Sequence, residues 1–234
     1  MATTLSSDKA ADHTSRGLPS GLAPAALVAS LWGASIACHT SLRGFSWTAT
    51  MLSLFLAINL LICAWELVLW RYLPDIQEDY RQHGSEPADY RVIADVFRTR
   101  SRRAGFDSRH WFHVWSFYAR LDRSYIERSS YGFVIDVCNG LFTLLPSLLI
   151  LVMLTWQEMP ARWLGVVMLA AFYQMLYGTV AYFFAYIVNR RGHAHPLSRV
   201  LVLVGGSNSI WIIFPAFGIS TALGLIGSGN YSGL

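Results

Sequence analysis

The chain has 234 residues, of which 54% are hydrophobic and only 14% are charged. Average soluble proteins carry about 25% charged residues, and the apolar residues of this chain are concentrated in long runs, so the composition argues against a soluble globular domain. The net charge of +4 does not indicate nucleic-acid binding, because the basic residues lie between the apolar runs as membrane topology requires. We therefore expect an all-α integral membrane protein.

Five apolar stretches follow a polar N-terminal segment. Residues 1–20 are rich in Ser, Thr and Ala and predict a short disordered tail, and residues 21–234 predict one membrane domain. The stretches lie at about 22–40, 48–70, 131–155, 163–188 and 200–226. The last four are long enough to cross a hydrocarbon core of about 30 Å, and the first is retained because no charge falls inside it. The predicted fold is a five-transmembrane-helix bundle with a cytoplasmic helical insertion, residues 71–130, between the second and third helices.

The basic residues predict how this bundle is oriented. Sixteen of the eighteen Lys and Arg residues lie on the side that holds the N-terminus, the insertion and the 189–199 loop. The positive-inside rule therefore places the N-terminus and the insertion in the cytoplasm. We expect a multi-pass protein of the lipid bilayer, in the plasma membrane if the chain is bacterial and in the endoplasmic reticulum if it is eukaryotic. Within the insertion, residues 89–103 and 110–121 have helical spacing.

Two acidic residues, Glu66 and Asp136, lie inside apolar stretches, whereas the other twelve lie outside them. A carboxylate in hydrocarbon costs roughly 2.5–3.5 kcal/mol on insertion scales, so an acid in this position indicates a functional site. Burial also favours the protonated form of a carboxyl, which is the form that a general acid needs. Both acids, and Asn208 with them, are expected a turn or two below the cytoplasmic surface.

Each of the last four spans carries a polar or aromatic stripe at helical spacing, which we expect to face one cavity in the bundle interior. The stripes are Asn59, Cys63, Glu66 and Trp70; Asp136, Asn139, Gly140, Thr143 and Ser147; Gln174, Tyr177, Gly178, Ala181 and Tyr182; and Asn208, Trp211, Pro215 and Gly218. The predicted catalytic residues are Glu66, Asp136, Asn208 and Trp211. The predicted substrate-binding residues are Asn59, Trp70, Asn139, Thr143, Gln174, Tyr177 and Tyr182.

These residues also have plain structural interpretations. Glu66 could snorkel toward the headgroups, and Asp136 with Asn139 could form a polar clasp between helices. Asn208 and Trp211 could serve packing alone. The conjunction of two acids, amides and a tryptophan at one depth favours a catalytic site. The chain has no metal-ligand cluster at a known spacing and no glycine-rich phosphate loop, so we expect neither a metal nor a cofactor.

Two carboxyl groups in a dry cavity suit proton transfer at carbon. One donates a proton to an alkene, the other removes a proton from the allylic position, and the intermediate is a carbocation. The face of a tryptophan stabilises a desolvated cation by about 2 kcal/mol or more. The constellation therefore predicts an apolar substrate that enters from the bilayer.

Several motifs resemble the emopamil-binding protein family, the sterol Δ8–Δ7 isomerases of the EXPERA superfamily. The segment Tyr118-x3-Asp122-x2-Tyr125, followed by Asp136, is similar to that family's Tyr-x3-Asp-x2-Tyr segment and third-span glutamate. The resemblance covers about residues 115–220, and its further motifs are Gln174-Met-Leu-Tyr177-Gly178, Tyr182-Phe183, Gly192-His193, His195-Pro196 and Asn208-x2-Trp211-x3-Pro215.

The resemblance implies a cofactor-independent isomerase with five spans. In it, Asp136 would be a proton-transfer group, Asn208 its polar partner and Trp211 the residue that faces the cation. Glu66 matches the family's second-span glutamate, but Ile62 stands where the family has a histidine. The expected function is a double-bond shift in a sterol or other isoprenoid. The alternatives are a terpenoid cyclase or epoxide isomerase of the same architecture and a non-catalytic EXPERA-like protein that binds sterol or lipid; a homodimer is compatible with the sequence.

Overall fold

A computed structural model describes residues 17–100, 105–232 and 234. These residues are predominantly helical, and among them the only β pairing is an isolated antiparallel bridge between Pro19 and Arg100. The prediction of an all-α chain is therefore confirmed. Of the expected N-terminal tail, residues 1–16 lie outside the described residues. At its end, the backbone N–H of Ser20 donates to the Thr99 carbonyl at 2.9 Å.

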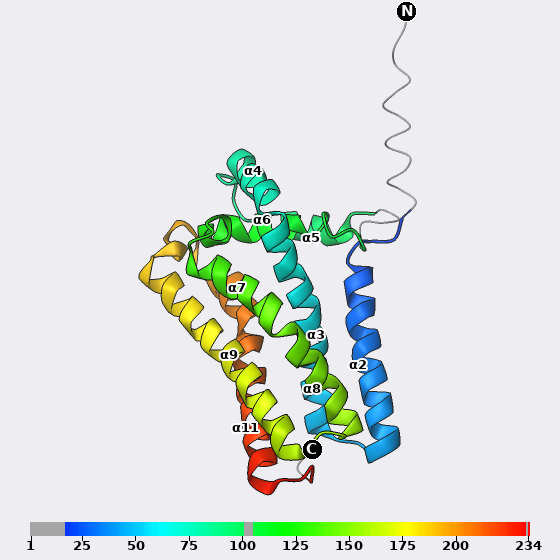
Figure 1. The fold of residues 1–234 in the computed structure, drawn as a ribbon. Coiled ribbons are helices and arrows are strands. Elements are labelled where there is room, and N and C mark those ends of the chain that lie inside the picture. The colour runs from blue at the N-terminus through cyan, green and yellow to red at the C-terminus, as the bar shows by residue number, and fades with distance from the viewer. Residues whose placement is uncertain (1–16, 101–104, 233) are drawn as a thin grey trace, which may run out of the picture.

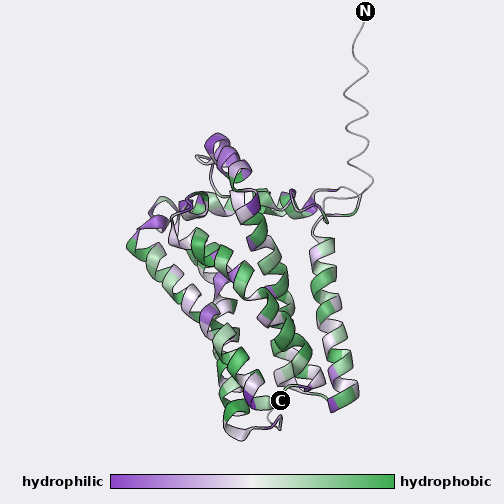
Figure 2. Ribbon diagram, in the orientation of Figure 1, coloured by the Kyte–Doolittle hydropathy of each residue, from purple (hydrophilic) through white to green (hydrophobic). Residues whose placement is uncertain are grey.

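In the described part of the chain, four helical segments are long and apolar enough to cross a membrane, and a bent pair of shorter helices makes a fifth if it counts as one span. The four are α2 (Leu22–Arg43), α3 (Trp47–Arg71), α9 (Ala161–Val188) and a continuous run, Leu197–Ser228. That run consists of α10 (Leu197–Val200), the π-helical turn η3 (Leu201–Gly206) and α11 (Ser207–Ser228). Figure 2 shows these helices as predominantly apolar. The chain thus has the several apolar helices expected of a multi-pass membrane protein.

The expected third span, residues 131–155, is broken in the middle. α7 (Tyr131–Phe142) and α8 (Leu144–Trp156) are bent by 45° relative to each other. Pro146 explains the break, because a proline has no backbone N–H and its ring collides with the carbonyl four residues earlier, here that of Phe142. At the junction, the Thr143 hydroxyl donates to the Asn139 carbonyl at 2.7 Å. Both halves of the bent pair still pack against α3.

The segment between α3 and α7 forms a layer over one end of the bundle, which we call the roof. It contains α4 (Leu73–His83), α5 (Tyr90–Arg98), α6 (Phe112–Leu121) and the 3-10 helix η1 (Arg123–Ile126). Figure 1 shows the roof lying across the upper ends of the bundle helices. The expected helices at 89–103 and 110–121 correspond to α5 and α6; residues 101–104 lie outside the described residues. Trp115 fastens the roof to α3, since its indole N–H donates to the Trp65 carbonyl at 2.7 Å.

At the opposite end, the helices close around a cluster that we call the lower core. Its members include Leu52, Phe55, Leu56, Ile150, Leu164, Met168 and Phe172. The Phe55 ring lies 5.3 Å from Phe214 and 6.1 Å from Phe172, between centroids. α11 comes close to the Phe172 ring because residue 218 is glycine, and a Cβ on Gly218 would collide with that ring. In Figure 1, α3 and α9 lie closer together here than they do below the roof, so the bundle widens toward the roof.

Candidate functional site

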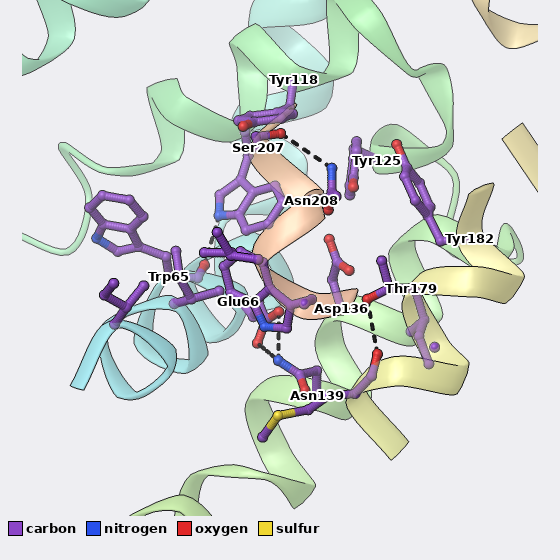
Figure 3. Close-up of a pocket in the computed structure, with 18 of the residues that line it drawn as sticks. Trp65, Glu66, Tyr118, Tyr125, Asp136, Asn139, Thr179, Tyr182, Ser207 and Asn208 are labelled. Atoms are coloured by element: carbon purple, nitrogen blue, oxygen red, sulfur yellow. Dashed lines mark hydrogen bonds between the residues drawn. The ribbon is translucent and has the colours of Figure 1, made fainter. Parts of the chain in front are cut away.

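Directly below the roof, the upper parts of α3, α7, α9 and α11 surround a cavity of about 290 Å³. Helix α6 and Tyr125 of η1 contribute its top. The four residues predicted to be catalytic all line this cavity: Glu66, Asp136, Asn208 and Trp211. Figure 3 shows the acidic and amide side chains pointing into it from different helices. The fold therefore brings together groups that are up to 145 residues apart, from position 66 to position 211.

Glu66 is buried, with 4% of its surface exposed, and is held by Asn139 of α7. The Asn139 amide nitrogen donates to both carboxyl oxygens of Glu66, at 2.9 and 2.8 Å. The two helices approach closely because residue 140 is glycine. A Cβ on Gly140 would lie 2.9 Å from the Glu66 Cβ and 3.0 Å from the Cys63 carbonyl oxygen. Glu66 therefore does not snorkel toward the headgroups, and its carboxyl is fixed in the bundle interior.

A run of hydrogen bonds beneath the cavity joins Glu66 to Trp211. The Thr143 hydroxyl donates to the Asn139 side-chain oxygen at 3.1 Å. Asn59, whose amide nitrogen lies 3.5 Å from the Thr143 hydroxyl, accepts the indole N–H of Trp211 at 3.0 Å. The Glu66 carboxyl and the Trp211 ring are therefore positioned by one connected set of side chains, which spans α3, α7 and α11.

Asp136 has different surroundings from Glu66. It lies on α7 three residues before Asn139, so it is about 4.5 Å nearer to the roof along the helix. The residue is half-buried, and Figure 3 shows its carboxyl pointing into the cavity toward Asn208. Tyr125 of the roof is a polar neighbour of this carboxyl. Burial, with the nearby Asp136 as a second cause, raises the pKa of the Tyr125 hydroxyl well above its usual value, so this hydroxyl stays protonated.

Asn208 enters the cavity from the first turn of α11, just after the π-helical turn. Its amide nitrogen donates to the Val204 carbonyl at 2.8 Å and to the Ser207 hydroxyl at 3.3 Å. The Ser207 hydroxyl in turn donates to the Leu203 carbonyl at 2.5 Å. Single π-helical turns inside helices are frequent at functional sites. Here the side chains of Ser207 and Asn208 donate hydrogen bonds to carbonyls of the π-helical turn, and these bonds hold Asn208 at the cavity wall.

The predicted substrate-binding residues fall into three groups. Asn139, Gln174 and Tyr182 line the cavity. Asn59 and Thr143 lie beneath its wall, buried in the hydrogen-bond run described above. Trp70 and Tyr177 are 52% and 59% exposed and do not contribute to the lining.

The placement of Trp70 and Tyr177 corrects the expectation that they contact a substrate in this cavity. Trp70 lies in the last turn of α3, beyond the level at which Trp65 meets the roof. Tyr177 lies on the outer face of α9, where it stacks with Tyr173 at 6.0 Å between centroids. Tyr177 is three places after Gln174, and it points away from the face that Gln174 shares with Gly178, four places along. Trp70 is four places after Glu66, so it lies about one turn further toward the end of α3.

Six polar or aromatic lining residues were not among the predicted site residues: Trp65, Trp115, Tyr118, Tyr125, Thr179 and Ser207. Trp65, Thr179 and Ser207 each stand directly beside a stripe residue in the sequence, so a wider stripe would have included them. Tyr118 and Tyr125 come from the roof. The only sequence signal for them was the Tyr118-x3-Asp122-x2-Tyr125 motif, which contains both.

Among the residues that the structure describes, no group of three or more His, Cys, Asp or Glu side chains is placed to hold a metal ion. No protein-family model matches the chain, and no characterised protein matches its sequence. The functional interpretation therefore depends on the cavity and on the motifs quoted above.

Proposed function

We propose that this protein is a membrane-embedded isomerase that shifts a double bond in a sterol or another isoprenoid by acid–base proton transfer. The proposal includes a five-span topology, with α7 and α8 as one bent span and with the N-terminus and the roof in the cytoplasm. The basic residues support this orientation, because among the described Arg residues only Arg43 and Arg162 lie at the end of the bundle away from the roof.

The observation that carries the proposal is the presence of two carboxyl groups in one cavity between apolar helices. Each carboxyl is costly in a membrane. Their surroundings differ, since Glu66 accepts the Asn139 amide on both oxygens whereas Asp136 faces the open space. Two carboxyls in different environments can take the two roles of acid and base.

In the proposed reaction, Asp136 is the acid and Glu66 is the base. The Asp136 carboxyl transfers its proton to one carbon of the double bond, which forms a C–H bond and leaves a carbocation at the neighbouring carbon. Glu66 removes a proton from a carbon next to the cation, and the electrons of that C–H bond form the new double bond. Asn139 orients the Glu66 oxygens, and the Trp211 ring faces the cation and lowers its free energy.

The test is expression of the chain in yeast that lacks its own sterol isomerase, followed by profiling of sterols and other nonpolar lipids. The wild-type chain should produce a shifted double-bond isomer, and Asp136→Asn and Glu66→Gln should abolish it, because neither amide can exchange a proton as a carboxyl does. Asp95→Asn is the matched control, since Asp95 is exposed on α5 in the roof. An unchanged lipid profile, with the protein present in the membrane, would refute the sterol substrate.

The size of the cavity favours one second candidate. Ligand pockets typically measure roughly 300–1,000 Å³, and this cavity of about 290 Å³ is slightly smaller than that range. A terpenoid cyclase or epoxide isomerase, in which Asp136 protonates only one end of an isoprenoid, requires less enclosed space than a reaction on a whole sterol. A cyclised terpenoid in the same lipid profile, lost with Asp136→Asn, would identify this activity.

A further inference from the structure

Asp122, in the roof, is a buried carboxylate with one satisfied and one unsatisfied oxygen. Its Oδ1 accepts the Ser124 backbone N–H at 2.8 Å and the Arg191 guanidinium at 2.9 Å. Its Oδ2 is buried and has no hydrogen-bond partner among the described residues. The Asp122 side chain is 1% exposed, whereas that of Arg191 is 17% exposed, so the ion pair reaches from the buried interior of the roof to a partly exposed residue in the loop after α9.

A structural role explains only half of this arrangement. The Oδ1 contacts cap η1 and tie the roof to the loop after α9, which accounts for the ion pair. A buried oxygen without a hydrogen bond destabilises the fold, and more so when the group is charged, so such an atom in a native fold calls for an explanation. Anchoring the roof does not require Oδ2 to stay unpaired.

Two buried tyrosines lie between Asp122 and the cavity. Tyr182 of α9 is 4% exposed and is a neighbour of the Asp122 carboxylate. Its ring lies 6.3 Å from the Tyr125 ring, between centroids, and Tyr125 is the roof neighbour of Asp136. Figure 3 shows Tyr125, Tyr182 and Asp136 along one side of the cavity. Since a tyrosine hydroxyl both donates and accepts a hydrogen bond, it can pass a proton on while remaining neutral.

We propose that Asp122, Tyr182 and Tyr125 form a proton path that connects the Asp136 carboxyl with water beside Arg191, where the loop after α9 meets the roof. Reorientation of the two hydroxyl groups lets Tyr125 reach Asp136 and Tyr182 reach Asp122 Oδ2. A proton taken up at the roof passes from Asp122 to Tyr182 and Tyr125 and arrives at Asp136, while each hydroxyl gives up one proton and receives another.

The use of this path in catalysis rests on the proposed function, whereas the path itself does not. After one double-bond shift, Asp136 has lost a proton and Glu66 has gained one. The next turnover therefore requires one proton to reach Asp136 and one proton to leave Glu66. Glu66 lines the same cavity as Asp136 and releases its proton there, whereas lipid hydrocarbon supplies no proton to Asp136. A path through the roof restores the acid from water.

The experiment measures proton exchange at Asp136 without any substrate. Purified protein in lipid vesicles is transferred from H₂O to D₂O, and infrared difference spectra follow the downshift of the protonated carboxyl C=O band that disappears in Asp136→Asn. The pH is set where this band is present in the wild type. Tyr125→Phe and Tyr182→Phe should each slow the downshift by about tenfold, the effect on a rate of losing one hydrogen bond from the path.

Two controls separate the path from a general change in the protein. Tyr177→Phe removes an exposed hydroxyl from the same helix as Tyr182 and should leave the exchange rate at the wild-type value. The band that disappears in Glu66→Gln reports exchange at the other carboxyl, and its rate should not change in Tyr125→Phe. Wild-type exchange at Asp136 in both Tyr125→Phe and Tyr182→Phe would overturn the proposed path. This result would not depend on whether the protein is an isomerase.

Discussion

Near the roof, the bundle helices surround a cavity with two carboxyls and several amides, whereas at the other end they close around the phenyl rings of Phe55 and Phe172. Glycine brings helices together in both places, but for different purposes. In the lower core, Gly218 lets α11 pack against an aromatic ring; below the cavity, Gly140 lets α7 reach a carboxyl on α3. In a membrane, helices associate mainly through close packing and hydrogen bonds. The closely packed apolar end can therefore offset the packing contacts that are missing around the cavity at the polar end.

The comparison predicts that stability and proton chemistry can be separated by mutation. The largest effect is expected for Phe172→Ala, because Phe172 is fully buried in the lower core. The free energy of unfolding should fall by about 3–5 kcal/mol, as for other large-to-small changes in a packed core. Thermal unfolding in detergent measures this loss.

Phe184→Ala is the matched control, since Phe184 is on the same helix but 69% exposed, and its effect on stability should be small. In the folded fraction of Phe172→Ala, the infrared exchange rate at Asp136 should match the wild type. A protein that is as stable as the wild type but exchanges at an altered rate would show that the two ends are not separable in this way.

Gly140→Ala tests the polar end directly and should have the second-largest effect. The new Cβ would lie 2.9 Å from the Glu66 Cβ, which forces α7 away from α3. Overpacking of this kind costs about 1–3 kcal/mol, and the displacement should also weaken the hydrogen bonds between Asn139 and Glu66. The expected result is a lower unfolding temperature together with a shifted Glu66 carboxyl band.

The control for this change is Gly224→Ala on α11, where an added Cβ meets nothing within 4 Å. That variant should be at least as stable as the wild type, because alanine favours a helix by roughly 1 kcal/mol over glycine. A Glu66 band unaffected by Gly140→Ala would mean that the close approach of the helices does not position the carboxyl.

The membrane helices and the polar stripe residues of the cavity lining follow from the sequence because both depend on local periodicity. Glu66, Asp136, Asn208 and Trp211 share helical faces and similar depths, and the structure gathers all four in one cavity. These features need only the 3.6-residue repeat and the length of each apolar run. The catalytic roles of the four residues remain predictions.

The features that the sequence did not predict depend on contacts between distant segments. The bend between α7 and α8 was not expected, although Pro146 is present in the sequence of the predicted third span. The position of the roof over the cavity, and with it the contribution of Tyr125, depends on docking between Trp115 and Trp65, which are 50 residues apart. Asn59 was expected to bind substrate, yet its side chain bonds Trp211, a pairing that spacing within one helix cannot indicate.

The smallest effect is expected for Trp211→Phe, which keeps an aromatic face at the cavity but removes the indole N–H. Its bond to the Asn59 oxygen, 3.0 Å long, is lost, and the free energy of unfolding should fall by about 1 kcal/mol. Trp163→Phe, at a position that is 65% exposed, is the control and should have little effect.

A double-mutant cycle with Asn59→Leu tells whether the bond between these two side chains or the ring itself matters. If the bond positions the ring, Asn59→Leu alone should alter both the stability and the lipid product profile. Added to Trp211→Phe, in which the bond is already lost, Asn59→Leu should cause little additional change in the product profile. Additive effects on the profile would instead show that Asn59 acts through Thr143 and Glu66 rather than through Trp211. The hydrogen-bond run beneath the cavity would then serve the base and not the residue that faces the cation.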